Sequence, residues 1–251
     1  MPKYSIEKNP NLKVEKKEMS CDGKIANNIS PPLSSVSHMY VFCGAPGSGK
    51  TNVMLNLISK SKPKNGFKTS YFKAFEHVFI VSPSLHTIKN SPFKDHPEEK
   101  VYEEFNYEFL NDIDEFTTMT AADCQSTLII LDDIGSQMKN GGALERKFAQ
   151  ICQTRRHRFL SIWILQQRYL QLPKAIRASS LTHIFLFKPQ NQLELKQIFD
   201  EMLSGAIDKK QLLDFQTFVY DKKHNFLFVD MSLANSNKFL FYKNYDLINF
   251  D

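Results

Sequence analysis

Short apolar runs alternate with amphipathic stretches along most of this chain. The runs have the length of buried strands and lie at 40–43, 77–81, 127–131, 160–165 and 182–187. Between them, two stretches carry core residues at helical spacing: Phe105, Phe109, Ile113 and Phe116, and then Leu144, Phe148, Ile151 and Cys152. Strands that alternate with helices predict an α/β fold with a mostly parallel central sheet and helices on both faces.

The pattern also predicts how the chain is divided. Residues 1–37 are polar and lysine-rich, so we expect a flexible N-terminal arm. The alternating runs place the main α/β core at 38–205. We expect residues 206–251 to form a C-terminal helix and hairpin that pack on this core as an appendage.

Two signals mark elements near the C-terminal end. Asn191 and Glu194 have the spacing of a capping box, which predicts a helix with one apolar face formed by Leu195, Ile198, Phe199 and Met202. The apolar runs 226–231 and 239–242, separated by a polar loop, predict the hairpin.

The segment after the first predicted strand carries the strongest chemical signal. It reads G-x-x-x-x-G-K-T between a strand and a helix, which is a Walker A phosphate loop formed by Gly44, Ala45, Pro46, Gly47, Ser48, Gly49, Lys50 and Thr51. The glycines let backbone N–H groups turn toward phosphates, and the helix start adds the positive end of its dipole. Lys50 would reach the β- and γ-phosphates, and the Thr51 hydroxyl is a ligand for Mg²⁺. We therefore expect ATP and Mg²⁺ as cofactors.

A pair of carboxylates follows the third predicted strand. Four apolar residues lead into Asp132 and Asp133, which is the pattern of a Walker B element. Because ligands bind at the carboxyl ends of strands in such sheets, we expect both residues to lie near the phosphate loop. Asp132 would hold Mg²⁺, usually through water, and Asp133 would polarise the attacking water. Many ATPases carry Glu at the second position, and the shorter Asp133 is less suited to act as the base.

Gln166 ends the strand that follows Walker B. At that position it is either a polar sensor of the γ-phosphate and attacking water or simply a polar strand terminus, and its neighbour Gln167 is an alternative sensor.

Basic residues are unevenly distributed. The net charge of +5 is a mild bias, but all six arginines lie between 146 and 177: Arg146, Arg155, Arg156, Arg158, Arg168 and Arg177. The planar fork of arginine suits phosphate and interface contacts, so the cluster indicates either a shared role of that kind or ion pairs with neighbours such as Glu145. Five lysines and no acidic residue lie between 60 and 73, which is typical of a solvated loop or of contact with a phosphate backbone.

Other features narrow the class of protein. The four cysteines show no C-x-x-C spacing, which favours buried thiols in a reducing compartment over a zinc site or a disulfide framework. No apolar run reaches the roughly 18–20 residues of a membrane span, and the polar start lacks the apolar core of a signal peptide.

The order of the motifs resembles a known family. The phosphate loop, Leu131-Asp132-Asp133, Arg156-His157, the strand ending in Gln166, and the Pro-x-x-x-Arg series from Pro173 to Arg177 occur as in poxvirus-type genome-packaging ATPases. These belong to the FtsK–HerA group of P-loop motors in large DNA viruses and virophages. The resemblance covers about residues 39–200.

The resemblance implies an additional-strand, RecA/FtsK-like P-loop fold and a ring that moves double-stranded DNA into a capsid. The ring would be hexameric or pentameric and would dock on a capsid or portal vertex protein. It also implies that an arginine reaches a neighbouring subunit's γ-phosphate; Arg156 is the first candidate and Arg177 the second, with Arg155 and Arg158 supporting or facing DNA. The expected location is the host cytoplasm or viral factory, or the virion.

Other P-loop classes fit less well. A nucleotide kinase or an AAA+ helicase would carry an arginine in a C-terminal lid, and no arginine follows Arg177. A GTPase would show an Asn/Thr-Lys-x-Asp motif, which the sequence lacks. A nucleotide-dependent structural or portal-binding protein with little turnover stays open, although Lys50, Thr51 and Asp132 argue against it.

Overall fold

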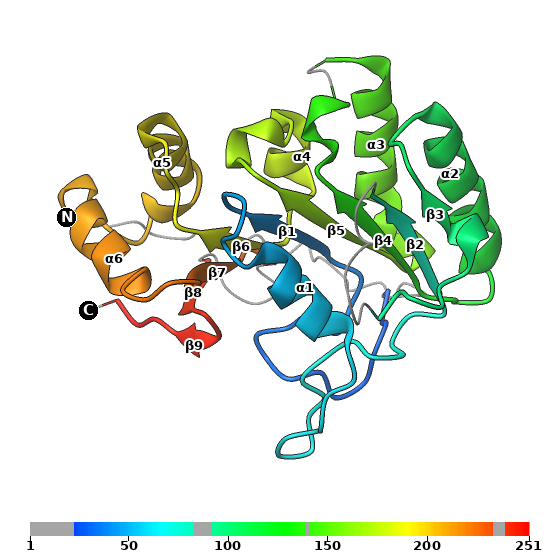
Figure 1. The fold of residues 1–251 in the computed structure, drawn as a ribbon, viewed down its shortest axis with the longest axis horizontal. Helices are drawn as coiled ribbons and strands as arrows, with labels where there is room; N and C mark the ends of the chain where they lie inside the picture. Colours follow the sequence, from blue (N-terminus) through cyan, green and yellow to red (C-terminus); the bar gives the residue numbers. More distant parts are fainter. Residues whose placement is uncertain (1–22, 83–91, 139–140, 233–238, 251) are drawn as a thin grey trace, which may run out of the picture.

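The computed structural model describes residues 23–82, 92–138, 141–232 and 239–250. The fold is built on one nine-stranded sheet with the order β3-β2-β4-β5-β1-β6-β7-β8-β9 (Figure 1). The strands are β1 (Met39–Cys43), β2 (His77–Val81), β3 (Val101–Tyr102), β4 (Thr127–Asp132), β5 (Leu160–Gln166), β6 (His183–Phe187), β7 (Phe226–Asp230), β8 (Leu240–Lys243) and β9 (Asp246–Leu247). All five strands predicted for the core are present, within one residue of the expected bounds at each end.

Helices cover both faces of the sheet, as predicted. The α-helices are α1 (Lys50–Ile58), α2 (Tyr107–Ala121), α3 (Ala143–Thr154), α4 (Lys174–Ser179), α5 (Gln192–Ile198) and α6 (Leu212–Val219). Short turns of 3₁₀ helix are η2 (Glu98–Lys100), η3 (Ile134–Ser136), η4 (Arg155–Arg158), η5 (Tyr169–Gln171) and η7 (Lys209–Gln211), and η6 (Phe199–Leu203) is a π-helical segment. Figure 1 shows α2, α3 and α4 on one face of the sheet and α1 on the other.

Alternation along the strands gives the two faces different side chains. Toward α2–α5 the strands present mainly aliphatic residues, such as Val41, Ile129 and Ile164, which pack against helix residues such as Phe109 and Phe148. Toward α1 they present many aromatic residues: Tyr40, Phe42, Trp163, Phe185, Phe187, Phe226 and Phe228. Within the described ranges a single α-helix lies on that face, so large rings fill the space that additional helices fill on the other.

Part of the predicted N-terminal arm also packs on the aromatic face. Residues 1–22 lie outside the described ranges, but Ile25 and Ile29 are buried in the same cluster as α1. The backbone of Lys24 pairs with Val36, and Ser37 N donates to Gly23 O at 2.7 Å. The described part of the arm, residues 23–37, is thus a packed segment, which corrects our expectation of a flexible one.

The predicted C-terminal hairpin is present as β7 and β8, and its loop at 233–238 lies outside the described ranges. Strands β1 to β6 run parallel to one another, whereas β7 pairs antiparallel with β6. The hairpin, together with β9, therefore extends the central sheet instead of forming a separate layer on it.

The capping box predicted before α5 is only half present. Asn191 is the N-cap and accepts from Leu193 N at 2.8 Å. The Glu194 carboxylate does not close the box; it accepts from Tyr169 N and from Cys43 Sγ instead. A tertiary contact has replaced the local one.

The strand order determines where functional groups meet. Strand β5 lies between β1, which leads into the phosphate loop, and β4, which ends at Asp132. In this register Cys43 is opposite Gln166, and Asp132 is opposite Leu165. The Walker A loop, the Walker B carboxylates and Gln166 consequently share the carboxyl edge of three adjacent strands.

Candidate active site

The phosphate loop runs from the end of β1 to the start of α1. Gly44 N donates to Gln166 O at 3.1 Å, and Ser48 N donates to Ala45 O at 3.1 Å. A Cβ on Gly44 would lie 2.6 Å from the Cβ of Phe187, so no larger residue fits there. Gly49 has φ 112°, a conformation that L side chains rarely adopt. The backbone thus requires glycine at both positions.

Helix α1 begins at Lys50, directly after this loop. The first N–H groups of a helix have no acceptor within the helix, and the dipole adds partial positive charge at the same point. Together they form an anion site.

The Lys50 ammonium lies across the mouth of the loop. Its Nζ donates to Gly44 O at 2.5 Å and to Ala45 O at 3.1 Å. Partial burial lowers the Lys50 pKa, while the carboxylates of Asp132 and Asp133 act in the opposite direction. The two carboxylates are therefore close enough to Lys50 to interact with its charge.

Asp132 and Asp133 have different surroundings. Ser82, directly after β2, donates through Oγ to Asp132 Oδ2 at 2.9 Å, which orients a half-buried carboxylate. Asp133 is exposed, has φ 53° and accepts from Gln167 Nε2 at 2.7 Å. The first carboxylate is held in place within the protein, and the second projects from the edge of the sheet.

Gln166 is the most unusual polar group in the site. Its side chain is fully buried, yet neither Nε2 nor Oε1 has a hydrogen-bond partner within the described residues. Ser48 Oγ in the phosphate loop is also buried and without a partner there. Buried polar groups normally have partners, so both side chains retain hydrogen-bonding capacity for a polar ligand, as do the buried atoms Thr127 Oγ1, Arg155 Nε and Arg177 Nε elsewhere in the fold.

Gly135 sets how closely the chain approaches Gln166. A Cβ at Gly135 would lie 2.8 Å from Gln166 Oε1 and 3.0 Å from the Gln171 Cβ. The turn after Walker B thus packs directly on the Gln166 amide.

The two arginines considered for contact with a γ-phosphate lie away from the phosphate loop. Arg156 is exposed on η4, which ends two residues before β5 begins, so the length of β5, roughly 20 Å, separates it from the carboxyl edge. Arg177 Nη1 donates to both carboxylate oxygens of Glu201 at 2.8 and 2.9 Å, and its guanidinium lies 4.8 Å from the centre of the Tyr169 ring. The fold does not bring Arg156 to its own phosphate loop, and it engages Arg177 within the subunit.

The arginines beside Arg156 have structural contacts. Arg155 is buried and donates to Cys152 O at 2.8 Å, at the end of α3. Arg158 pairs with Asp114 of α2, which also pairs with Lys147. These contacts fix η4 against α2 and α3 and leave Arg156 on the surface.

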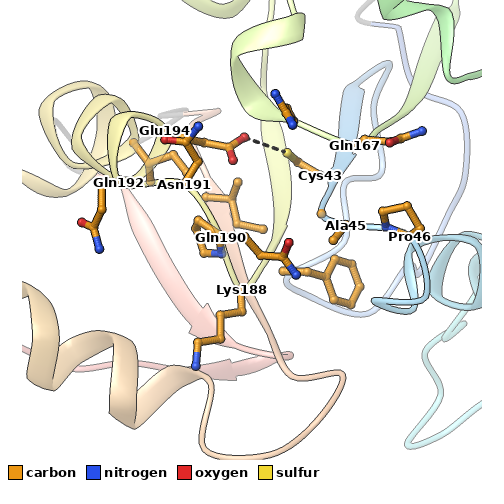
Figure 2. Close-up of a pocket in the computed structure, with 15 residues that line it drawn as sticks. Cys43, Ala45, Pro46, Gln167, Lys188, Gln190, Asn191, Gln192 and Glu194 are labelled. Carbon is orange, nitrogen blue, oxygen red and sulfur yellow. Dashed lines mark hydrogen bonds between the residues drawn. The ribbon is translucent and has the colours of Figure 1, made fainter.

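Three further residues at the site had no clear signal in the sequence. Ser82 orients Asp132, and its only clue is its place at a strand end. His224 Nδ1 lies 2.9 Å from Ser48 O, although 176 residues separate them. Glu194 is buried beside Cys43, and Figure 2 shows its carboxylate directed at that thiol.

Two clefts border the phosphate loop. One, of about 620 Å³, lies between Ala45 and Pro46 and the start of α5, with Gln167, Lys188 and Gln190 on its walls (Figure 2). The other, of about 370 Å³, lies between Gly47 and Ser48 and the turn from Tyr220 to Asn225. The loop is accordingly open to a ligand.

Comparison with solved structures supports the fold assignment. The genome packaging NTPase B204 from Sulfolobus turreted icosahedral virus 2 superposes with a TM-score of 0.56 at 16% identity, over 84% of this chain and 98% of that one. B204 from Sulfolobus turreted icosahedral virus gives 0.57 at 15% identity, over 82% and 97%. EssC (ATPases 2 and 3) from Geobacillus thermodenitrificans gives 0.52 at 11% identity, over 84% and 39%. The chain has the P-loop NTPase fold.

Comparison of sequences identifies the family. No curated protein sequence matches the chain. The family model described as Poxvirus A32 protein matches residues 32–242, which is most of the chain and includes every motif at the site. The chain therefore belongs to the poxvirus A32 protein family, as the order of its motifs predicted.

Proposed function

We propose that this chain is an ATP-hydrolysing motor that moves double-stranded viral DNA into a capsid. The observation that carries the proposal is the meeting of Lys50, Asp132 and Gln166 at one sheet edge, in a chain of the poxvirus A32 family. The structural relatives support it: B204 is described as a DNA-packaging ATPase, and its structures contain AMP, ATP-γS or AMPPCP.

The residues fit a triphosphate with Mg²⁺. On binding, Lys50 Nζ would exchange Gly44 O and Ala45 O for phosphate oxygens, and the first N–H groups of α1 would hold the same phosphates. Thr51 in the first turn of α1 and the oriented Asp132 are hard oxygen donors, which Mg²⁺ prefers. Bound there, Mg²⁺ would neutralise charge that develops on the phosphate oxygens.

Two residues would act on the attacking water. Asp133 would polarise it, with Gln167 holding the carboxylate in place. The buried amide of Gln166 would find its missing partners in the γ-phosphate and that water.

A ring explains the position of Arg156. Its own phosphate loop is at the opposite end of the sheet, so any contact with a γ-phosphate would have to be made in a neighbouring subunit. An arginine supplied in this way couples one subunit's hydrolysis to the next. We propose a hexameric or pentameric ring that docks on a capsid or portal vertex protein, in the host cytoplasm or viral factory or in the virion. None of the helices within the described ranges has the length and apolar run needed to cross a membrane.

The test is the ATPase rate with and without double-stranded DNA, run alongside light scattering to size the oligomer. We expect turnover that duplex DNA stimulates in a ring-sized species, and no turnover with Lys50→Ala. Equal stimulation by single strands would favour a helicase. Nucleotide binding without turnover would favour a structural or portal-binding protein.

A further inference from the structure

The segment between α1 and β2 carries a run of exposed basic side chains. Residues 60–73, here called the lysine loop, contain five exposed lysines and no acidic residue: Lys60, Lys62, Lys64, Lys68 and Lys73. Figure 1 shows it as the cyan loop that projects beyond α1, away from the sheet. Within the described ranges none of these lysines forms a salt bridge. Five such charges on a projecting loop suit a polyanion as partner.

The lysine loop is well defined at its tip. Lys64 and Phe67 exchange both backbone hydrogen bonds, at 2.9 and 3.0 Å, across Asn65 and Gly66. Both central residues have positive φ, 52° and 79°, which is the geometry of a tight two-residue hairpin turn. The turn holds Lys64 and Lys68 on either side of the tip.

The two arms of the lysine loop are also held in place. Lys68 N donates to Asn28 O at 2.7 Å, and Ser30 N donates to Lys68 O at 2.9 Å. Ser61 and Ser70, on opposite arms, are joined through their hydroxyls at 2.9 Å. The lysine backbone positions are thus pre-organised, which lowers the entropic cost of binding.

The lysine loop is connected directly to the nucleotide site. It follows Ser59, the C-cap of α1, and Tyr71 N donates to Leu57 O in the last turn of that helix at 2.6 Å. The other end of α1 is the phosphate loop. A displacement of α1 that accompanies ATP binding or hydrolysis would therefore move the lysine loop.

The lysine loop lies at the same end of the parallel strands as Arg156, the end at which β5 begins. The segment that starts at Gly23, where a Cβ would lie 3.0 Å from Arg156 O, runs to Asn28 and Ser30, which pair with Lys68. Exposed basic groups from two parts of the chain thus lie at the amino ends of the parallel strands, whereas the phosphate loop lies at their carboxyl ends.

We infer that the lysine loop is the element that binds the phosphate backbone of duplex DNA, an inference that rests on the function proposed above. Lysine contacts phosphate as a point charge and reads no base sequence, so it suits a motor that must move along any sequence. Because the loop is attached to α1, a change in the bound nucleotide would change the position of the lysines on the DNA.

The test is the salt dependence of binding to a random-sequence duplex, measured by fluorescence anisotropy. A variant with Lys62→Gln, Lys64→Gln and Lys68→Gln should reduce the slope of log K against log[salt] by about 3, because each substitution removes one lysine–phosphate pair. Thermal melting would establish that the variant is folded. The matched control, Lys196→Gln with Lys209→Gln and Lys210→Gln, changes three exposed lysines near α5 and α6 and should keep the wild-type slope. Phe67→Ala at the tip removes no charge and should keep it as well.

Three outcomes would overturn the inference. If the wild type binds duplex and the loop variant keeps its slope, the lysine loop does not contact DNA, although the proposed function stands. An unchanged slope in a variant that no longer co-sediments with capsids would make the loop a protein-docking surface. If the wild type does not bind duplex at all, the proposed function fails and the inference fails with it.

Discussion

At the scale of single residues, two adjacent carboxylates have environments that suit different roles in the proposed hydrolysis. Asp132 is oriented by Ser82 and half-buried, whereas Asp133 is exposed and accepts a hydrogen bond from Gln167. The first environment suits a metal partner that must not move, and the second suits a group that meets water.

Substitutions at these two carboxylates should have different consequences. Asp132→Ala should abolish turnover because Mg²⁺ would lose its carboxylate partner. Asp133→Asn should keep ATP binding and slow hydrolysis by ~10²-fold or more, the usual contribution of a general base. Nucleotide titration and steady-state kinetics with each variant would distinguish them. Wild-type turnover by Asp133→Asn would move the base role to another residue.

A second prediction at this scale concerns the approach of Gly135 to Gln166. In Gly135→Ala the new methyl group would lie 2.8 Å from Gln166 Oε1, so the amide must move. We expect unchanged ATP affinity and hydrolysis slowed by up to about 10²-fold, the cost of displacing a positioning group by about 1 Å. Nucleotide titration and steady-state kinetics would measure both. Equal hydrolysis by this variant would show that Gln166 is only a polar strand terminus.

At the scale of elements, Arg177 connects α4 to η6. Its side chain is 8% exposed and pairs with Glu201, while its guanidinium lies over Tyr169 of η5. We expect Arg177→Ala to lower the free energy of unfolding by roughly 1–3 kcal/mol, since it deprives a partly buried carboxylate of its charged donor. A urea titration would measure the decrease.

A double-mutant cycle with Glu201→Gln separates the two roles considered for Arg177. If the role is structural, Glu201→Gln should cost little in a chain that already carries Arg177→Ala, because the two residues act as a pair. The other role, contact with a neighbouring subunit's γ-phosphate, predicts a different result. Arg177→Ala would then keep the wild-type stability, and its hydrolysis would fall ~10³-fold.

What the sequence predicts well at this scale is local in origin. The strands, the phosphate loop and the Asp132-Asp133 pair follow from runs and spacings that each lie within a short stretch of chain. Glu194 shows the opposite case: it has the spacing of a capping box, but the fold offers its carboxylate the N–H of Tyr169, and that contact prevails. His224 and Ser48 are brought together only by the sheet order, which no local pattern encodes.

The N-terminal arm shows another limit of prediction from sequence. Ile25 and Ile29 have helical spacing within a polar stretch, yet this segment is not helical and packs on the aromatic face beside α1. Scattered apolar residues among many polar ones are too few to predict burial. They are buried because the fold offers them an apolar surface beside α1.

At the scale of the whole molecule, the separation of Arg156 from its own phosphate loop predicts shared sites. Arg156→Ala should bind ATP, because its loop is intact, and should hydrolyse it ~10³-fold more slowly. Lys50→Ala should also be inactive. A mixture of the two should recover ATPase activity, since Lys50→Ala subunits supply an arginine to intact loops in Arg156→Ala subunits.

The mixture needs one control. Mass measurement must show that mixed rings form, and each variant alone must form rings of the wild-type size. Mixed rings without recovered activity would place Arg156 outside the neighbour's site.

The most direct test of the proposed motor is displacement of a third strand from a DNA triplex. A motor that moves along duplex DNA should release the third strand in the presence of ATP and Mg²⁺. Lys50→Ala and a non-hydrolysable ATP analogue should both fail to release it, while the wild type should do so whatever the sequence of the approach duplex. Steady ATP hydrolysis by a duplex-bound ring with no release of the third strand would contradict translocation.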